Sequence, residues 1–187
     1  MDSKLANPTP LGLISFGLTT VLLSFANAGL IPAEAAIFAM AFFLGGIAQT
    51  FAGIMEFFRG NTFGCAAFTA FGAFWLSLFG IYLLPAIFPA VDAFKTANLN
   101  VLGIWIGLWG IYAFLLLLCI FKGGRILSFV FVTLVIVFWS LSAFYFTQSP
   151  AILTFAGYLG IVCGGSAFYL GTAIVLDETA GKKILPY

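Results

Sequence analysis

The sequence predicts an all-α membrane protein with six transmembrane helices in a single domain, residues 1–187. Hydrophobic residues make up 63% of the chain and charged residues only 7%, whereas soluble domains carry about 25% charged residues. A helix needs about 20 apolar residues to cross a bilayer, and six runs of that length can be drawn. The expected spans are residues 10–28, 32–57, 63–88, 98–121, 125–146 and 150–176.

The first two spans are separated by a short break around Gly29. Pro32 is expected near the first position of the second helix, where its missing N–H leaves no hydrogen bond unmade. Glu34 is expected in the first turn of that helix, where a carboxylate interacts favourably with the helix dipole.

Proline and glycine also mark the later breaks. Pro85 and Pro89 are expected to end the third helix, and the sequence Lys-Gly-Gly-Arg at 122–125 separates the fourth from the fifth. Ser149 is a candidate N-cap of the sixth helix, directly before Pro150. Because most connections are short, consecutive helices are expected to be antiparallel neighbours.

The distribution of Lys and Arg predicts the orientation in the cell membrane. With a cytoplasmic N-terminus, the cytoplasmic segments hold all the basic residues except Lys95. These residues are Lys4, Arg59, Lys122, Arg125, Lys182 and Lys183. Loops rich in Lys and Arg stay in the cytoplasm, so we expect both termini on the cytoplasmic side.

Composition excludes several classes of function. The chain contains no histidine, which removes imidazole acid–base chemistry and Ser-His triads. Cys65, Cys119 and Cys163 lie in separate apolar runs without CxxC spacing, so they are expected to be buried packing residues. No basic patch indicates nucleic-acid binding. We therefore expect a protein that is not an enzyme and that needs no cofactor or metal.

Residues 45–75 are the most informative stretch of the chain. Gly45, Gln49, Gly53 and Glu56 share one face of the second helix, and large apolar residues occupy its other faces. Lipid tails cannot hydrogen-bond an amide or a carboxyl, so this face must contact protein or water. Its glycines allow a neighbouring helix or a ligand to approach closely.

The turn after the second helix places Asn61 or Thr62 as N-cap of the third. The free N–H groups at the start of that helix point into the same region, and a helix N-terminus favours anions. We therefore expect this corner to form the mouth or wall of a solute path.

Other uncharged polar residues extend this predicted path. Thr20 and Asn27 share a face of the first helix, and Thr69 lies on the third with Phe71 and Trp75 in reach. Alternatively, the hydroxyls bond back to their own helix and Asn27 is a C-cap. Because no Lys or Arg lies at mid-membrane, a small anion would be bound weakly and released quickly, as conduction requires.

Two features allow two interpretations each. Glu56 is either paired with Arg59, three residues on, or a proton site that couples proton and solute movement. Stripes of small residues either pack helices within one bundle or form subunit contacts. The stripes comprise Gly103, Gly107 and Gly110 in the fourth helix, and Gly157, Gly160, Gly164, Ser166, Ala167 and Gly171 in the sixth.

Two motifs resemble the acetate uptake transporter family, whose bacterial members are succinate–acetate permeases. One is NPTPLGL at 7–13, in which Thr9 replaces the usual alanine of the family, an expected surface-scale change. The other is the stretch 45–75, GGIAQ…AG..E…GNTFG..AF…G.FW. The resemblance extends over the whole chain.

The resemblance implies a homohexamer in which each protomer has its own path for acetate and similar short monocarboxylates, and for succinate. Transport would be channel-like or coupled to protons. An apolar constriction would map to Phe16, Phe71 and Leu134, and Ala167 would match a pore-lining position. Related bacterial proteins often have tyrosine where this chain has Phe71, so a hydrogen bond at that point is lost. The alternative function is a channel for water, ammonia or formate.

Overall fold

The protein folds into a bundle of membrane-length helices, seen in a computed structural model that describes residues 5–92, 97–121 and 124–187. The described residues contain six helices long and apolar enough to cross a membrane, which confirms the predicted fold class. The elements are α1 (Thr9–Asn27), α2 (Ala35–Met40), η1 (Ala41–Ala48), α3 (Gln49–Phe58), α4 (Thr62–Ile87), α5 (Leu99–Ile120), α6 (Arg125–Thr147) and α7 (Pro150–Ala180). Elements α2, η1 and α3 join into one continuous spanning helix.

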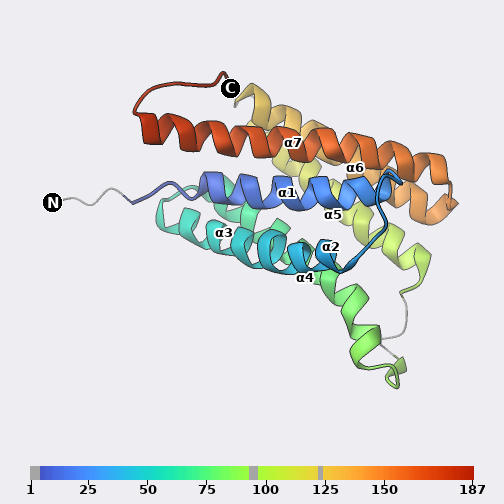
Figure 1. Ribbon diagram of the computed structural model, residues 1–187. Helices are drawn as coiled ribbons and strands as arrows, with labels where there is room; N and C mark the ends of the chain where they lie inside the picture. The colour runs from blue at the N-terminus through green and yellow to red at the C-terminus, as the bar shows by residue number, and fades with distance from the viewer. Residues whose placement is uncertain (1–4, 93–96, 122–123) are drawn as a thin grey trace.

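The helices surround a central core in a closed ring. Helix α1 lies between α7 on one side and the η1–α3 segment on the other (Figure 1). Helix α4 packs on η1 and α3, α6 packs on α7, and α5 packs on α6. The backbones of α4 and α5 approach each other at few points, so side chains must close the ring there.

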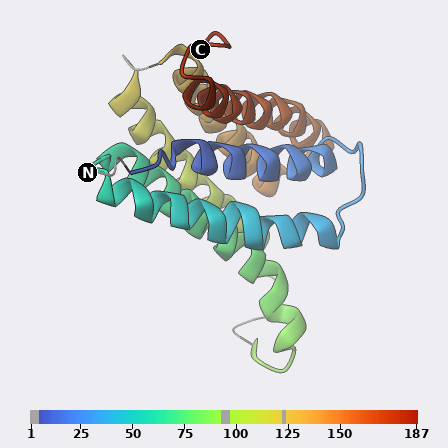
Figure 2. The same ribbon diagram turned by 60° about the vertical axis from the view of Figure 1, so that its left-hand side comes forward.

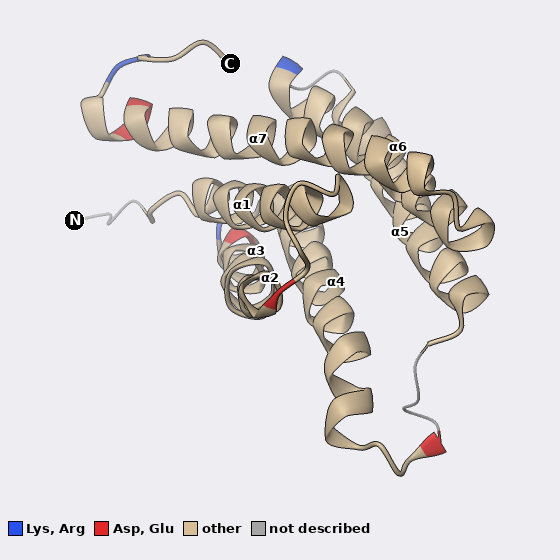
Figure 3. Ribbon diagram, turned by 45° about the vertical axis from the view of Figure 1, so that its right-hand side comes forward, with Lys and Arg blue, Asp and Glu red and all other residues tan. Residues whose placement is uncertain are grey.

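Both described ends of the chain lie at the same end of the bundle as the α3–α4 turn. We call this end the terminal end (Figure 2). Of the described basic residues, Arg59 and Arg125 lie close to it, as do Lys182 and Lys183 in the C-terminal tail (Figure 3). Lys4, Lys95 and Lys122 fall outside the described residues.

The second spanning helix differs from its prediction in two ways. It begins at Ala35 with Glu34 at the N-cap position, so Pro32 and Glu34 lie before the first turn and not inside it. Residues Ala41–Ala48 form a π-helix, which sequence periodicity did not predict. The wider turn coincides with Gly45 and Gly46, where the side chains of Trp75 and Leu76 occupy the space that a Cβ would need.

Three helix ends also correct the expectations. Pro85 lies inside the last turn of α4, which ends at Ile87. Pro85 has no N–H to bond the carbonyl of Ile81 one turn earlier, so it weakens the helix just before its end. Ser149 occupies the N-cap position of α7 but its side chain makes no capping hydrogen bond. Helix α7 extends to Ala180, past the expected end at residue 176.

The glycine stripes pack helices within the bundle. A Cβ on Gly17 of α1 would lie 2.6 Å from the backbone oxygen of Gly164 on α7. Gly103 and Gly110 of α5 receive the rings of Phe146 and Trp139 from α6. These contacts support packing within one protomer, the first of the two interpretations. The buried-cysteine prediction holds for Cys163, but Cys119 is exposed and Cys65 is half-buried.

Candidate solute path

A cavity of about 260 Å³ enters the bundle from the terminal end. Its wall comes from α1, α3, α4, α6, α7, the α3–α4 turn and the C-terminal tail, and it is mostly apolar. The lining residues are Thr9, Leu13, Phe16, Gln49, Asn61, Phe63, Gly64, Ala67, Phe68, Phe71, Gly124, Ile126, Leu127, Val130, Phe131, Leu134, Leu170, Ile174 and Tyr187.

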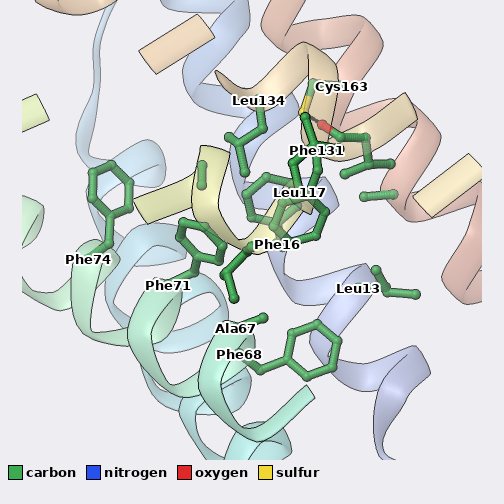
Figure 4. Close-up of a cluster of buried hydrophobic side chains, with 14 of the residues drawn as sticks. Leu13, Phe16, Ala67, Phe68, Phe71, Phe74, Leu117, Phe131, Leu134 and Cys163 are labelled. Atoms are coloured by element: carbon green, nitrogen blue, oxygen red, sulfur yellow. Dashed lines mark hydrogen bonds between the residues drawn. The ribbon is translucent and has the colours of Figure 1, made fainter. Parts of the chain in front are cut away.

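The three residues of the expected constriction lie together at one depth of the cavity. Phe16 and Phe71 have ring centroids 6.1 Å apart, and Leu134 lines the same cavity (Figure 4). Each is at least 94% buried, with exposed fractions of 6%, 3% and 3%. With a rise of 1.5 Å per residue, all three lie about 10–14 Å into their helices from the terminal end. We call these residues the waist.

Phe71 contacts four further aromatic rings besides Phe16. Rings of α5 and α6 lie within 6.2 Å of its centroid: Trp109, Tyr112, Phe131 and Phe138. Phe138 is nearly parallel to Phe71, whereas Tyr112 meets it edge-on. Such pairs add about 0.5–1.5 kcal/mol each beyond their burial, so the position of the Phe71 ring is strongly determined by its neighbours.

Gln49 brings a polar group into the mostly apolar wall at about the depth of the waist. It starts α3 and is only 1% exposed. Its Oε1 has no hydrogen-bond partner within the described protein. A buried amide without a partner is costly, so a solute or water in the cavity would gain a hydrogen bond there.

Glu56 lies behind the mouth of the cavity and is fully buried. The Thr9 hydroxyl donates to its Oε1, and the Asn61 Nδ2 donates to its Oε2 at 2.9 Å. Arg59 Nη1 lies 3.6 Å from Oε2. Thr9 and Asn61 both line the cavity, so the carboxylate holds two residues of the mouth in place.

The replacement of the usual alanine by Thr9 was expected to be a surface-scale change, but Thr9 has a structural role. It is half-buried and bonds a buried carboxylate. The same network continues outward, because Arg59 Nη1 donates to Asn7 Oδ1, and Asn7 Nδ2 donates to Glu178 Oε1 at 2.6 Å. It joins the segment before α1, the α3–α4 turn and the end of α7.

The helix cap expected at 61–62 is made by Asn61, whose Oδ1 accepts from Gly64 N at 3.0 Å. Thr62 begins α4 and is exposed. Of the residues predicted to line the path, the cavity wall therefore contains Phe16, Gln49, Asn61, Phe71 and Leu134.

The other predicted path residues lie outside the cavity wall. Thr69 Oγ1 packs against Gly53 across the α3–α4 contact, and Trp75 packs against Gly45. Thr20 lies beside Gly164 of α7, and Ala167 is fully buried on that helix. Asn27 is the half-buried last residue of α1.

Sequence reasoning missed most of the apolar wall. Leu13, Val130, Phe131 and Leu170 line the cavity, yet in a spanning helix they cannot be told from residues that face lipid. For Thr9 the sequence did offer a signal of a role at the cavity, because it is a polar residue directly before an apolar run.

Six membrane-crossing helices around an apolar cavity with one buried amide are the architecture of a small-solute membrane transport protein. A family model described as the GPR1/FUN34/yaaH family matches residues 1–186. The chain belongs to this family, and the resemblance inferred from NPTPLGL and residues 45–75 is confirmed.

Three relatives illustrate the range of the family. The succinate-acetate/proton symporter SatP of Escherichia coli (strain K12) is 45% identical, over 99% of this chain and 96% of the relative. Acetate permease A of Emericella nidulans is 32% identical, over 98% and 66%. Ammonia transport outward protein 2 of Saccharomyces cerevisiae is 37% identical, over 89% and 60%.

The fold has a solved counterpart. The structure of the bacterial acetate channel SatP matches this protein with a TM-score of 0.93 and 44% sequence identity, covering 98% of this chain and 99% of the other.

Proposed function

We propose that this protein carries acetate and related short carboxylates, including succinate, across the cell membrane through a path inside each protomer. The observation that carries this proposal is the apolar cavity that reaches the waist and contains the partnerless Oε1 of Gln49, an acceptor for the hydroxyl of a neutral carboxylic acid. The SatP relative, named as a succinate-acetate/proton symporter, supports the choice of substrate.

The waist acts as a selectivity barrier. Even on lenient scales a charge at the centre of a membrane costs at least ~2.5 kcal/mol, so hydrated inorganic ions are excluded. A short carboxylate passes when donors hold it on either side of the barrier, or when it crosses as the neutral acid. The candidate donors on the side of the mouth are the Nε2 of Gln49 and the second N–H of Asn61 Nδ2, whose first N–H donates to Glu56. The partnerless Oε1 of Gln49 is an acceptor, so it would bind the hydroxyl of the neutral acid.

The next turn beyond the waist provides further candidate donors. Thr20 and Trp75 follow Phe16 and Phe71 by one helical turn, and Thr20 Oγ1 and Trp75 Nε1 are both buried without a protein partner. Thr69 Oγ1 is also buried without a partner. We assign these groups, together with Asn27, Thr62 and Ala167, to the remainder of the path.

The orientation and assembly of the protein belong to the same proposal. The basic residues at the terminal end support a cytoplasmic position for both termini, since such residues are retained inside. The cavity would then open to the cytoplasm. The homohexamer rests on the family resemblance, and exposed aromatic side chains such as Phe43, Phe57 and Phe58 supply apolar surface for subunit or lipid contacts.

Ammonia is the second candidate solute. It is favoured by one relative, named as an ammonia transport outward protein, which is 37% identical to this chain. A small neutral molecule would pass the waist without the cost of moving a charge. The carboxylate proposal is preferred because SatP, which matches over most of both chains, is named for succinate and acetate.

Radiolabelled acetate flux into liposomes that contain only this protein tests the proposal. We expect flux above that of protein-free liposomes, and saturation or competition by succinate. Acetate flux measured with and without an imposed proton gradient separates passive passage from coupled uptake. Ammonia flux without acetate flux would overturn the carboxylate proposal in favour of the second candidate.

We propose that Glu56 anchors the mouth of the path and is not a proton site. Both of its oxygens accept hydrogen bonds, and these bonds tie it to Thr9 and Asn61 of the cavity wall. The Glu56→Gln variant is expected to keep any proton-driven accumulation of acetate. It is expected to lose about 1.5–3 kcal/mol of stability, the range for hydrogen bonds to charged groups.

Glu34→Gln is the matched control for this variant. Glu34 is exposed at the opposite end of the bundle and makes no side-chain capping bond, so its replacement should leave both stability and accumulation unchanged. Loss of accumulation in Glu56→Gln, with downhill acetate flux retained, would instead assign the proton site to Glu56.

A further inference from the structure

The seam between α4 and α5 is closed by aromatic side chains rather than by close backbone contact. Phe71 and Phe74 of α4 face Trp105 and Trp109 of α5, with ring centroids 5.2–6.2 Å apart. Rings of this size hold the two backbones apart. The width of the waist therefore depends on how this seam is packed, because Phe71 is part of both the waist and the seam.

Tyr112 of α5 contacts this seam in two ways. Its ring lies 5.8 Å from the Phe71 ring at an interplanar angle of 64°. Its hydroxyl donates to the backbone oxygen of Ala66 at 3.1 Å, and Ala66 lies on α4 five residues before Phe71. The hydroxyl thus ties α5 to α4 close to the residue that the ring supports.

Tyr112 lies outside the cavity wall, so a solute at the waist meets Phe71 and not Tyr112. The Phe71 ring contacts Phe16 of α1, and it also contacts Tyr112 of α5 and Phe138 of α6. To widen the waist, the Phe71 ring must move away from Phe16, and the rings of α5 and α6 occupy part of the space around it. The Tyr112 ring opposes that movement, and its hydroxyl keeps the two helices from separating.

We propose that Tyr112 is a positioning residue that sets the upper limit on the size of the carboxylate that passes the waist. It acts through Phe71 by fixing the separation of α4 and α5. This inference rests on the proposed function, since it assigns Tyr112 a role in the selectivity of that same path.

Tyr112→Phe is the informative variant, because it removes the hydroxyl and keeps the ring. The Ala66 oxygen remains in the α-helical ladder of α4, so the variant is expected to fold. The readout is the ratio of butyrate to acetate flux in proteoliposomes at equal protein content. One hydrogen bond changes an equilibrium about fivefold, so we expect this ratio to rise by roughly two- to fivefold.

Tyr112→Leu removes the ring as well and should raise the ratio further. Tyr158→Phe is the matched control, because Tyr158 is half-exposed on the outer face of α7 and its replacement should leave the ratio at the wild-type value. Unaltered ratios in Tyr112→Phe and Tyr112→Leu, with acetate flux intact, would overturn the inference while leaving the proposed function in place.

A double-variant comparison tests whether Tyr112 acts through Phe71. In the Phe71→Ala background, Tyr112→Phe should no longer change the ratio, because the side chain that it positions is gone. An equal change in both backgrounds would overturn the positioning role. Wild-type protein that gives no acetate flux above protein-free liposomes would overturn the proposed function, and the role of Tyr112 with it.

Discussion

The Phe71→Ala variant is expected to raise acetate flux about tenfold and to admit longer carboxylates and inorganic anions. The reason is that alanine leaves a space at the waist into which water can enter. A hydrated path lowers the cost of moving a charge, and ~1.4 kcal/mol off the barrier corresponds to a tenfold rate. The measurement is radiolabelled acetate, butyrate and chloride flux in proteoliposomes at matched amounts of folded protein.

The same change should also destabilise the protein, because replacing a buried phenylalanine with alanine costs about 3–5 kcal/mol. Phe79→Ala is the control. Phe79 is a half-buried residue of α4 that packs on Phe42, with ring centroids 4.8 Å apart, and lies outside the cavity wall. This control should leave the selectivity unchanged. A wild-type flux profile in Phe71→Ala would show that the ring does not limit passage.

The Gly17→Ala variant is expected to disrupt the contact between α1 and α7. A Cβ at Gly17 would lie 2.6 Å from Gly164 O and 2.6 Å from Phe168 N. Both atoms belong to the backbone of α7, so no side-chain rotation can relieve the clash. We expect a loss of about 3 kcal/mol, at the upper end for overpacked cores, and a clear fall in the thermal midpoint in detergent.

Gly165→Ala provides a matched control on the partner helix, because a Cβ at Gly165 meets no other atom within 4 Å. It should leave the thermal midpoint close to that of the wild type. If Gly17→Ala is as stable as Gly165→Ala, α1 and α7 do not approach as closely as described. Helix α1, which contributes Leu13 and Phe16 to the cavity wall, would then have a different register against α7.

Hydrophobicity and helical period predict the membrane-spanning helices well, but they predict only in part which helix faces contact protein. The apolar runs predict each span, because a helix in lipid must satisfy its own backbone. Gln49 and Glu56 were expected to face protein or water, because lipid offers them no partner, and both are buried within the protein. The π-helical turn at Ala41–Ala48 was not predicted; its glycines lie against the Trp75 and Leu76 side chains, a contact that the sequence does not reveal.

The candidate site was predictable where polarity or family resemblance singled residues out. The three waist residues came from the resemblance, and the structure brings them to one depth of one cavity. Thr69 was expected in the path because it is polar; its hydroxyl lies against Gly53 outside the cavity wall, and its place in the path stays a prediction. Nothing in the sequence indicated that Tyr112 reaches across to Ala66, because that contact joins two helices that meet only in the folded bundle.

By itself, the sequence determined that this chain crosses the membrane six times, which residues cannot face lipid, and to which family it belongs. These properties depend on hydrophobicity, helical period and motifs, all of which are local. Only the tertiary structure decided which apolar faces enclose the cavity, and that Glu56 holds Thr9 and Asn61 at its mouth. Those features depend on the rotation and register of each helix against its neighbours, which close glycine contacts such as Gly17 on Gly164 establish only once the bundle is assembled.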